Sequence, residues 1–276
     1  MERFNGPAAG RLLEVARRLA APLDPTTAAC TWVPPAGAGV CASCHAACPA
    51  PPGRARCRAC ALTAAQVRHP ADGITPISLF RSGDDLWYLL RRYKDGATAA
   101  ERRRCSRSLT RLLSQFLRFH LACVAPGIRP RWVLTAVPST RRRRDRFPME
   151  RVIRRSPWLR RRYRRTLVCA RPPGHNRADD GAFAVVGDLA GAEVVLVDDT
   201  YTTGASVQSA VSALHRAGAR VAGVIVIGRV VNPAIPAEAE LWAEAARRPF
   251  RLDRCCQCGP PETAGPRPPG KLVAIR

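Results

Sequence analysis

The sequence predicts an α/β protein in which helices flank a parallel sheet, with a small cysteine-rich module ahead of it. After Pro130, short runs of apolar and β-branched residues recur at 132–137, 166–170, 194–197 and 221–227. Such continuous runs are typical of strands buried on both faces. The stretch 205–217 between the last two runs has a helical pattern, so strand, helix and strand form a βαβ unit.

Two helices are expected ahead of these strands. Asp84 and Asp85 precede an apolar pattern that ends near Gly96, which is typical of a helix with acids in its first turn. Thr98 and Glu101 then have the spacing of a capping box. A long helix should follow, because apolar residues recur at helical spacing from 109 to 121.

The two ends of the chain differ from this pattern. Residues 1–21 have arginines scattered among leucines, which predicts an amphipathic helix ended by Pro22 and Pro25 rather than a signal peptide. From Asn232 onward the sequence is rich in Pro and Gly, and we expect partial disorder there. The expected domains are a helix and linker (1–29), the cysteine module (30–70), the α/β domain (71–231) and a C-terminal extension (232–276).

The composition is globular and strongly basic. Of 276 residues 46% are hydrophobic, and 45 Lys and Arg against 21 Asp and Glu give a net charge of +24. This excess favours a polyanionic partner, such as a nucleic acid or a phosphorylated substrate. No stretch reaches the roughly 18 apolar residues of a membrane-spanning helix. We therefore expect no membrane insertion and a cytoplasmic protein.

The cysteine module has the spacing of a zinc ribbon. Cys41 and Cys44 form one Cys-x2-Cys pair, and after a gap of twelve residues Cys57 and Cys60 form another. Two such pairs can present four thiolates to one tetrahedral Zn²⁺, with the gap folded as a short hairpin. Binding would supply folding energy that this segment, poor in large apolar residues, otherwise lacks. Two alternatives stay open: reduced thiols without metal, or a ligand set that includes Cys30, His45 or Cys48.

A second group of cysteines lies near the C-terminus, at Cys255, Cys256 and Cys258. These residues could contribute to the first zinc, form a separate metal site or remain unliganded thiols.

The most informative segment is 194–206. An apolar strand ends in Asp198 and Asp199, and a turn rich in Thr and Gly then enters a helix. Ligands of open parallel sheets bind at this end of the strands. A turn of small residues lets N–H groups converge on a phosphate at the helix N-terminus. The acids would repel a phosphate but suit sugar hydroxyls and a divalent cation, so the segment predicts a sugar-phosphate site. The alternative is that both acids merely cap the helix.

This segment resembles the signature of type I phosphoribosyltransferases. The resemblance implies a site for 5-phosphoribosyl 1-pyrophosphate (PRPP) with Mg²⁺. Asp198 and Asp199 would then hold the ribose 2- and 3-hydroxyls. The residues that would surround the 5-phosphate are Thr200, Tyr201, Thr202, Thr203, Gly204, Ala205 and Ser206.

From Cys41 to Arg229 the chain resembles more narrowly the ComF/GntX group of competence-associated phosphoribosyltransferase-like proteins. The resemblance rests on the cysteine pairs, Tyr93-Lys94, 136–140, 181–185 and the signature. It implies DNA uptake or nucleotide metabolism as the setting, catalytic roles for Lys94 and Arg146, and a pyrophosphate-binding turn. That turn comprises Val137, Pro138, Ser139 and Thr140.

The sequence also departs from these relatives. Of the stretch that usually follows the pyrophosphate turn, 146–149 keeps only the Arg and the Phe. Thr202 stands where purine-salvage relatives have a carboxylate that serves as general base, so purine salvage is disfavoured. We expect an unidentified nitrogen acceptor instead, and the arginines of 141–146 would cover the leaving group.

Two further hypotheses concern macromolecular partners. The stretch 141–165 has thirteen arginines and two acids, with Trp158 and Tyr163 among them, which favours single-stranded DNA binding without catalysis. The arginines expected to contact nucleic acid are Arg160, Arg161, Arg162, Arg164 and Arg165. Alternatively, the cysteine module could be an adaptor that docks DNA-processing proteins.

Overall fold

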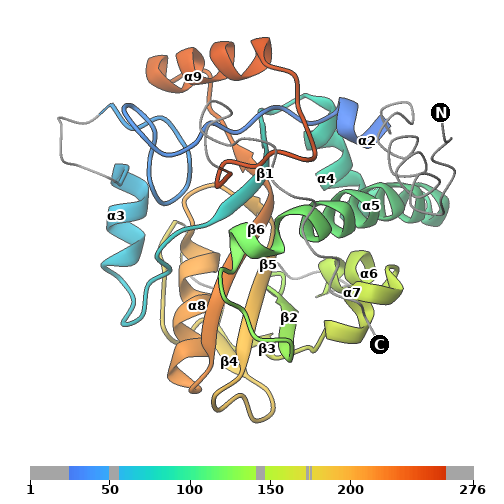
Figure 1. The fold of residues 1–276 in the computed structure, drawn as a ribbon, viewed down its shortest axis with the longest axis vertical. Helices are drawn as coiled ribbons and strands as arrows, with labels where there is room; N and C mark the ends of the chain where they lie inside the picture. Colours follow the sequence, from blue (N-terminus) through green and yellow to red (C-terminus); the bar gives the residue numbers. More distant parts are fainter. Residues whose placement is uncertain (1–24, 50–55, 141–146, 172–173, 175, 259–276) are drawn as a thin grey trace, which may run out of the picture.

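The computed structural model describes residues 25–49, 56–140, 147–171, 174 and 176–258 (Figure 1). The helix expected over 1–21 lies outside these residues, as does the C-terminal tail after Cys258. Within the described part, no helix is both long enough and apolar enough to cross a membrane.

A four-stranded parallel sheet forms the centre of the molecule, in the order β1-β6-β5-β2. Its strands are β1 (Thr75–Phe80), β2 (Trp132–Ala136), β5 (Glu193–Tyr201) and β6 (Arg220–Val230). Helix α8 (Ala205–Arg216) connects β5 to β6, so the predicted βαβ unit and parallel sheet are confirmed. The edge strand β1 was not predicted, because Pro76 and Ser78 interrupt its apolar run.

Helices cover both faces of the sheet, as expected (Figure 1). On one face, Val195 and Val197 of β5 pack in a core with helices α4 (Asp85–Asp95), α5 (Ala99–Val124) and α6 (Pro148–Arg154). On the other face, Val194 and Leu196 pack in a second core with α8 and the cysteine module. Alternate residues of a strand point to opposite faces, which separates these two cores.

One strand predicted with the others lies outside the central sheet. β3 (Leu167–Cys169) pairs antiparallel with β4 (Phe183–Val185), and together they form a two-stranded sheet. Only Leu167 of the three β3 residues is buried. Leu167 and Phe183 belong to the same core as α8.

The predicted helix starts have a clear physical basis. The Asp84 side chain accepts a hydrogen bond of 2.9 Å from the Trp87 N–H, and Gly96 ends α4. Thr98 accepts from the Glu101 N–H at 3.1 Å, so this half of the capping box is confirmed. Glu101 accepts from the N–H of Ala97 rather than from that of Thr98.

The described residues include four further helices: α2 (Pro25–Ala28), α3 (Arg58–Ala64), α7 (Pro157–Arg162) and α9 (Pro236–Arg247). Helix α9 lies in the C-terminal extension, where we expected partial disorder and did not predict a helix. Its apolar face is largely alanine, which gives a weak periodic signal. Leu241 and Ala245 nevertheless pack against Leu79 of β1 and against Cys256.

Candidate functional site

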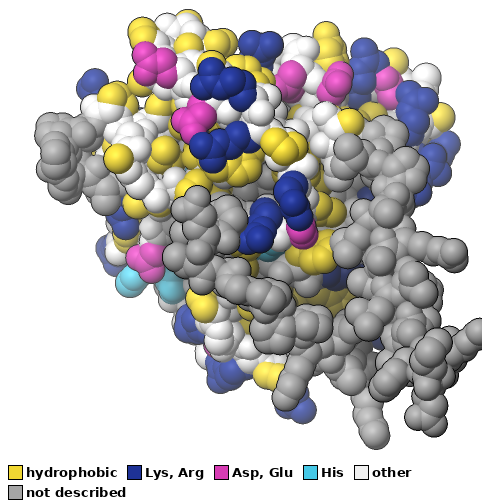
Figure 2. Space-filling view, turned by 45° about the horizontal axis from the view of Figure 1, so that its top comes forward, with side chains coloured by type: hydrophobic (Ala, Val, Ile, Leu, Met, Phe, Trp, Pro, Cys, Tyr) yellow, Lys and Arg dark blue, Asp and Glu magenta, His cyan; other side chains and the backbone are white. Residues whose placement is uncertain are grey.

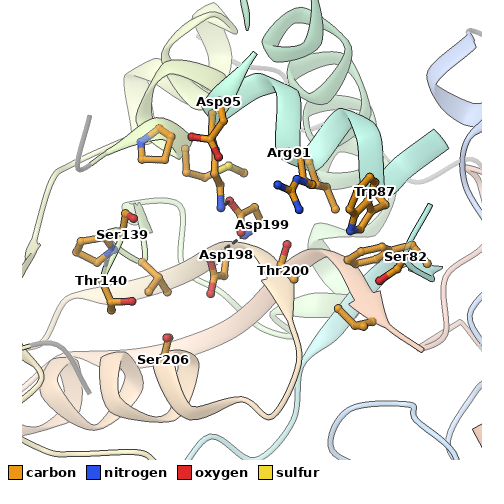
Figure 3. Close-up of a pocket in the computed structure, with 18 residues that line it drawn as sticks. Ser82, Trp87, Arg91, Asp95, Ser139, Thr140, Asp198, Asp199, Thr200 and Ser206 are labelled. Carbon is orange, nitrogen blue, oxygen red and sulfur yellow. Dashed lines mark hydrogen bonds and ion pairs between the residues drawn. The ribbon is translucent and has the colours of Figure 1, made fainter. Parts of the chain in front are cut away.

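The two acids of the signature segment lie within β5 rather than after its end. Asp198 pairs with Val226, and the pairing with β6 continues to Tyr201 and Arg229. Because side chains alternate along a strand, Asp198 points to the α8 face and Asp199 to the α4 face. Figure 3 shows Asp198 directed toward Ser206 and Asp199 directed toward α4.

Asp199 is held by two consecutive residues of α4. The Tyr93 hydroxyl donates a hydrogen bond to its Oδ2, and Lys94 Nζ forms an ion pair with the same oxygen. Tyr93 is fully buried, and burial together with the negative charge of Asp199 raises the pKa of Tyr93 well above its ordinary value. The tyrosine therefore stays protonated and serves as a fixed donor.

Asp198 is half-buried, and its Oδ1 accepts a hydrogen bond of 2.8 Å from the N–H of Asp199. Burial, with added repulsion from Asp199, raises the pKa of Asp198 to about 8. A cation placed beside Asp198 would reverse this shift, because it favours the ionised carboxylate. Asp199 is thus already paired with Lys94, whereas Asp198 would be stabilised in its ionised form by a bound cation.

A cavity of about 390 Å³ opens above the acid pair (Figure 3). It lies between α4, the turn after β2 and the start of α6. Its polar wall includes Lys94, Ser139, Thr140, Asp198 and Asp199. Trp87, Arg91 and Asp95 of α4 also line it, and these three were not singled out from the sequence.

A second cavity of about 240 Å³ lies in the turn that leads into α8. It shares with the first cavity Thr140, Asp198, Thr200 and Ser206. The two cavities therefore adjoin, with Asp198 in the wall of both, and together they are called the cleft. The first N–H groups of a helix have no partner inside the helix, and the first turn of α8 has no acidic side chain.

Gly204 is required by the shape of this turn. Its φ is +88°, in the left-handed region that favours glycine. A Cβ at this position would lie 2.1 Å from the Tyr201 hydroxyl oxygen. Tyr201 is itself buried, and its hydroxyl lies 3.4 Å from Cys60 Sγ.

The structure places most of the predicted ligand-binding residues around the cleft. All seven residues from Thr200 to Ser206 line the smaller cavity. All four residues of the predicted pyrophosphate turn line the larger one, where Ser139 and Thr140 are half-buried. Val137 is buried and donates its N–H to the Val197 carbonyl at 3.0 Å. Arg146 and its neighbours from 141 lie outside the described residues.

Sequence reasoning gave no role to Tyr93. One signal was present, since Tyr93 continues the stripe of Leu86 and Leu90 at helical spacing. A tyrosine buried on such a stripe needs an acceptor for its hydroxyl. The acid pair is the acceptor that the α/β fold places nearby.

The predicted four-cysteine group is assembled and could hold a metal ion. The Sγ atoms of Cys41, Cys44, Cys57 and Cys60 all lie within 4.8 Å of one another. Four thiolates at this separation suit a structural Zn²⁺. The N–H of Cys57 also donates to Cys41 Sγ at 3.2 Å, and such a contact favours the thiolate.

The alternative ligands lie outside this group. His45 Nδ1 is 2.8 Å from the Pro34 carbonyl oxygen, and Cys30 Sγ donates to the Thr26 carbonyl. Cys48 is buried but does not belong to the group. The hairpin expected between the cysteine pairs includes 50–55, which lie outside the described residues, and the second pair leads into α3.

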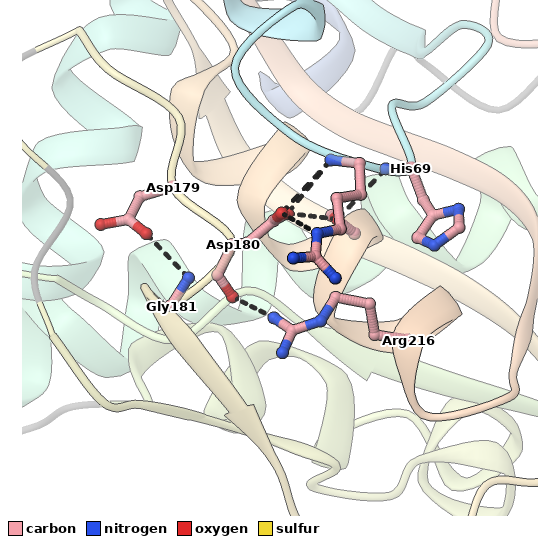
Figure 4. A network of polar contacts seen from close by, with 7 residues as sticks. His69, Asp179, Asp180, Gly181 and Arg216 are labelled. Carbon is pink, nitrogen blue, oxygen red and sulfur yellow. Dashed lines mark hydrogen bonds and ion pairs between the residues drawn. The ribbon is translucent and has the colours of Figure 1, made fainter.

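The cysteine module packs directly behind the smaller cavity. Thr63 Oγ1 donates to the Thr203 carbonyl at 3.3 Å, and the N–H of Ala71 donates to Gln208 Oε1 at 2.7 Å. Asp180, which precedes β4, joins the module to a later part of α8 (Figure 4). Its carboxylate accepts hydrogen bonds from the Arg68 N–H and from the Ser212 hydroxyl, and its backbone carbonyl accepts one from Arg216. The module is thus part of the support of the turn at 202–206.

A buried arginine, Arg229, interacts with Cys44 of the four-cysteine group. Arg229 lies with its guanidinium 5.6 Å from the centre of the Tyr201 ring. Burial lowers the pKa of Arg229, but attraction to Cys44 and Glu238 outweighs this and raises it. The pair Tyr201 and Arg229 connects the cysteine group to the last paired positions of β5 and β6.

Some of the arginines proposed for nucleic-acid contact are exposed, whereas others make contacts within the protein. Arg160, Arg161 and Arg164 are exposed. Arg165 Nε donates to Glu150 at 2.9 Å, and Arg162 donates to the Pro130 carbonyl and covers the ring of Trp132. Because Trp132 begins β2, Arg162 lies near the end of the sheet opposite the acid pair.

The two aromatic residues among these arginines do not form a stacking platform. Tyr163 is buried and its hydroxyl donates to Glu150 at 3.1 Å, so its ring does not face solvent, contrary to the expectation. Trp158 is half-buried against Trp132, with ring centres 6.3 Å apart. On the face drawn in Figure 2, basic side chains are spread among acidic ones rather than gathered in one band.

Comparisons with protein families and with curated proteins find no match to this chain.

Replacing Gly204 by alanine tests the geometry of the turn. We expect Gly204→Ala to lower the free energy of unfolding by roughly 2 to 4 kcal/mol, since it combines left-handed strain with a collision at Tyr201. Gly187→Ala is the matched control, because Gly187 has a φ of +84° but open space around its Cβ position. The control should cost about 1 kcal/mol. Equal losses in urea unfolding would contradict the collision.

The acid pair predicts opposite effects for two similar substitutions. The raised pKa of Asp198 means that, between about pH 4 and 8, the folded chain holds a proton that the unfolded chain has released. Stability therefore falls as the pH rises through this window. Asp198→Asn should abolish that fall and be more stable than wild type by about 1 kcal/mol or more at pH 8.

Asp199→Asn should instead destabilise the fold by about 1 to 3 kcal/mol, because it leaves Lys94 and Tyr93 without their anionic partner. Thermal unfolding of both variants between pH 4 and 8 measures the contrast. A pH dependence in Asp198→Asn identical to that of wild type would rule out this explanation.

Proposed function

We propose that the cleft binds PRPP and that the chain transfers its 5-phosphoribosyl group to a nitrogen acceptor. The observation that carries this proposal is the junction of the two cavities at Asp198. A smaller cavity at a helix N-terminus adjoins a larger one with two acids, and Thr140, Asp198, Thr200 and Ser206 line both. A ligand with a phosphate, a sugar and a second anionic group fits this division.

The smaller cavity would take the 5-phosphate. Its wall consists of small residues and hydroxyl side chains at the start of α8, without an acid in the first helical turn. Backbone N–H groups and the positive end of the helix dipole favour an anion there. Gly204 allows the chain to turn closely enough for these groups to converge.

The acid pair would face the ribose. Asp198 can accept hydrogen bonds from sugar hydroxyls, and ionises most readily when a cation lies beside it. Carboxylate and phosphate oxygens are the ligands that Mg²⁺ prefers, and when bound it would neutralise charge on the pyrophosphate. Asp199 would act chiefly by fixing Lys94 and Tyr93 at the edge of the larger cavity.

The remaining part of the larger cavity would receive the pyrophosphate and the acceptor. Ser139 and Thr140 offer hydroxyl donors from the turn after β2, and Lys94 and Arg91 add positive charge from α4. As the acceptor nitrogen forms a bond to ribose C1, the bond from C1 to the pyrophosphate oxygen breaks. These donors stabilise the negative charge on the departing pyrophosphate.

The sequence resemblance supports the same reaction. The order of the strand, acid pair and Thr-Gly turn is typical of type I phosphoribosyltransferases, and the cysteine pairs and Tyr93-Lys94 extend the likeness to the ComF/GntX group. We infer a type I phosphoribosyltransferase fold and a setting in DNA uptake or nucleotide metabolism from this resemblance. Thr202 is exposed and offers no carboxylate as general base, so the acceptor is one that needs none.

Calorimetry tests the binding step. We expect heat on titrating Mg-PRPP into the chain, and at least tenfold weaker binding, or about 1.4 kcal/mol, for Asp198→Asn. Glu240→Gln is the control, since Glu240 is exposed on α9 and should leave affinity unchanged. Ser206→Ala should weaken ribose 5-phosphate more than free pyrophosphate. A wild-type chain without heat from Mg-PRPP would refute the proposal.

A further inference from the structure

A second group of metal-type ligands lies on the α5 side of the molecule, outside the cleft. His120 and Cys123 belong to α5, and Cys255 and Cys258 to the segment after α9. Their ligand atoms all lie within 4.8 Å of one another. Nothing in the proposed reaction uses these residues.

The distances suit a tetrahedral ion. Cys258 Sγ lies 3.8 Å from Cys123 Sγ, 3.4 Å from Cys255 Sγ and 3.5 Å from His120 Nδ1. Cys123 Sγ lies 4.0 Å from the same Nδ1. Sulfurs bound at about 2.3 Å to one tetrahedral zinc ion lie roughly 3.8 Å apart. We propose that these four residues form a second structural zinc site, with three thiolates and one imidazole.

The surroundings of His120 support a ligand role. Its Nε2 lies 2.9 Å from the Leu252 carbonyl oxygen. A carbonyl can only accept, so Nε2 carries the proton and the lone pair of Nδ1 faces the thiols. This is the arrangement found in histidine ligands, whose second nitrogen donates to a carbonyl or carboxylate and fixes the ring.

The local geometry of the cysteines points the same way. His120 and Cys123 are three residues apart on a helix and so share a face. Cys255 and Cys258 form a Cys-x2-Cys turn, closed by the N–H of Cys258 on the Cys255 carbonyl at 3.0 Å. The N–H of Cys255 also donates to Cys258 Sγ at 3.4 Å, which favours a thiolate there.

The intervening Cys256 has a different role. It is buried among Val33, Leu79 and Leu241, which places it in the core between α9 and β1. The three C-terminal cysteines thus have two different roles: Cys255 and Cys258 are ligands, and Cys256 is a packing residue. The proposed ion would attach the segment after α9 to α5, and so hold α9 over the edge of the sheet (Figure 1).

Metal analysis of the untagged full-length chain tests this proposal. We expect two zinc ions per wild-type chain, one of them in the four-cysteine group. Cys258→Ser and Cys44→Ser should each reduce zinc to about one per chain. Cys256→Ala and Cys169→Ser are the matched controls and should retain two. One zinc ion in wild type, unchanged in Cys258→Ser, would overturn the proposal.

Cobalt spectroscopy decides the case if Cys258→Ser fails to fold. In the Cys44→Ser background, Co²⁺ should give the visible absorption of a tetrahedral site with three thiolates. Adding His120→Cys should retain binding and shift the spectrum toward that of four thiolates. An unchanged spectrum would contradict ligation by His120. For the wild-type chain, a thiol count of ten instead of twelve in denaturant would contradict the site as well, since it would indicate a disulfide.

Discussion

The contact of Tyr93 and Lys94 with Asp199 is the interaction on which the cleft depends. β5 is buried on both faces, yet it carries two adjacent acids, and a buried carboxylate without a partner is costly. Consecutive residues at the end of α4 supply a hydroxyl and an ammonium to the same carboxylate oxygen. This contact sets the distance between α4 and the sheet, and the larger cavity is the space that remains beside it.

The same contact explains why the two acids differ. Asp199 is paired with Lys94. The pKa of Asp198 is raised to about 8, first by burial and then by the neighbouring charge of Asp199. The alternation of the strand then directs Asp198 toward the turn before α8. Strand β5 thereby places Asp199, held by Lys94 and Tyr93, at the larger cavity, and Asp198 in the wall shared by both cavities.

Support for the turn comes from the opposite face of the sheet. The buried Tyr201 hydroxyl contacts Cys60, while Arg229 covers the Tyr201 ring and interacts with Cys44. Gly204 fits against the Tyr201 hydroxyl, so the path of the turn follows from the position of the cysteine module. The module, which the sequence suggests as a separate adaptor, is thus joined to the proposed ligand site.

The sequence predicted the features that depend on local pattern. The βαβ unit, the helix that begins at Asp84 and Asp85, the cap at Thr98 and the four-cysteine group all follow from spacing and are found. It missed β1 and the alanine-rich α9. In β1, Ser78 is buried and accepts a hydrogen bond of 2.8 Å from the Thr31 N–H. It also missed long-range partners, such as Glu150 for Tyr163 and Arg165, and His120 for Cys258. Such partners are chosen by tertiary packing and leave no local signal.

Hydrogen exchange with and without Mg-PRPP tests the central claim, that one cleft binds the phosphate and the sugar of this ligand. The amides of 139–140 and 202–206 form its two rims, and bound phosphate and pyrophosphate should occupy N–H groups there. We predict slower exchange in both segments together. Unchanged exchange there, or slowing confined to the exposed arginines of 160–165, would contradict the claim.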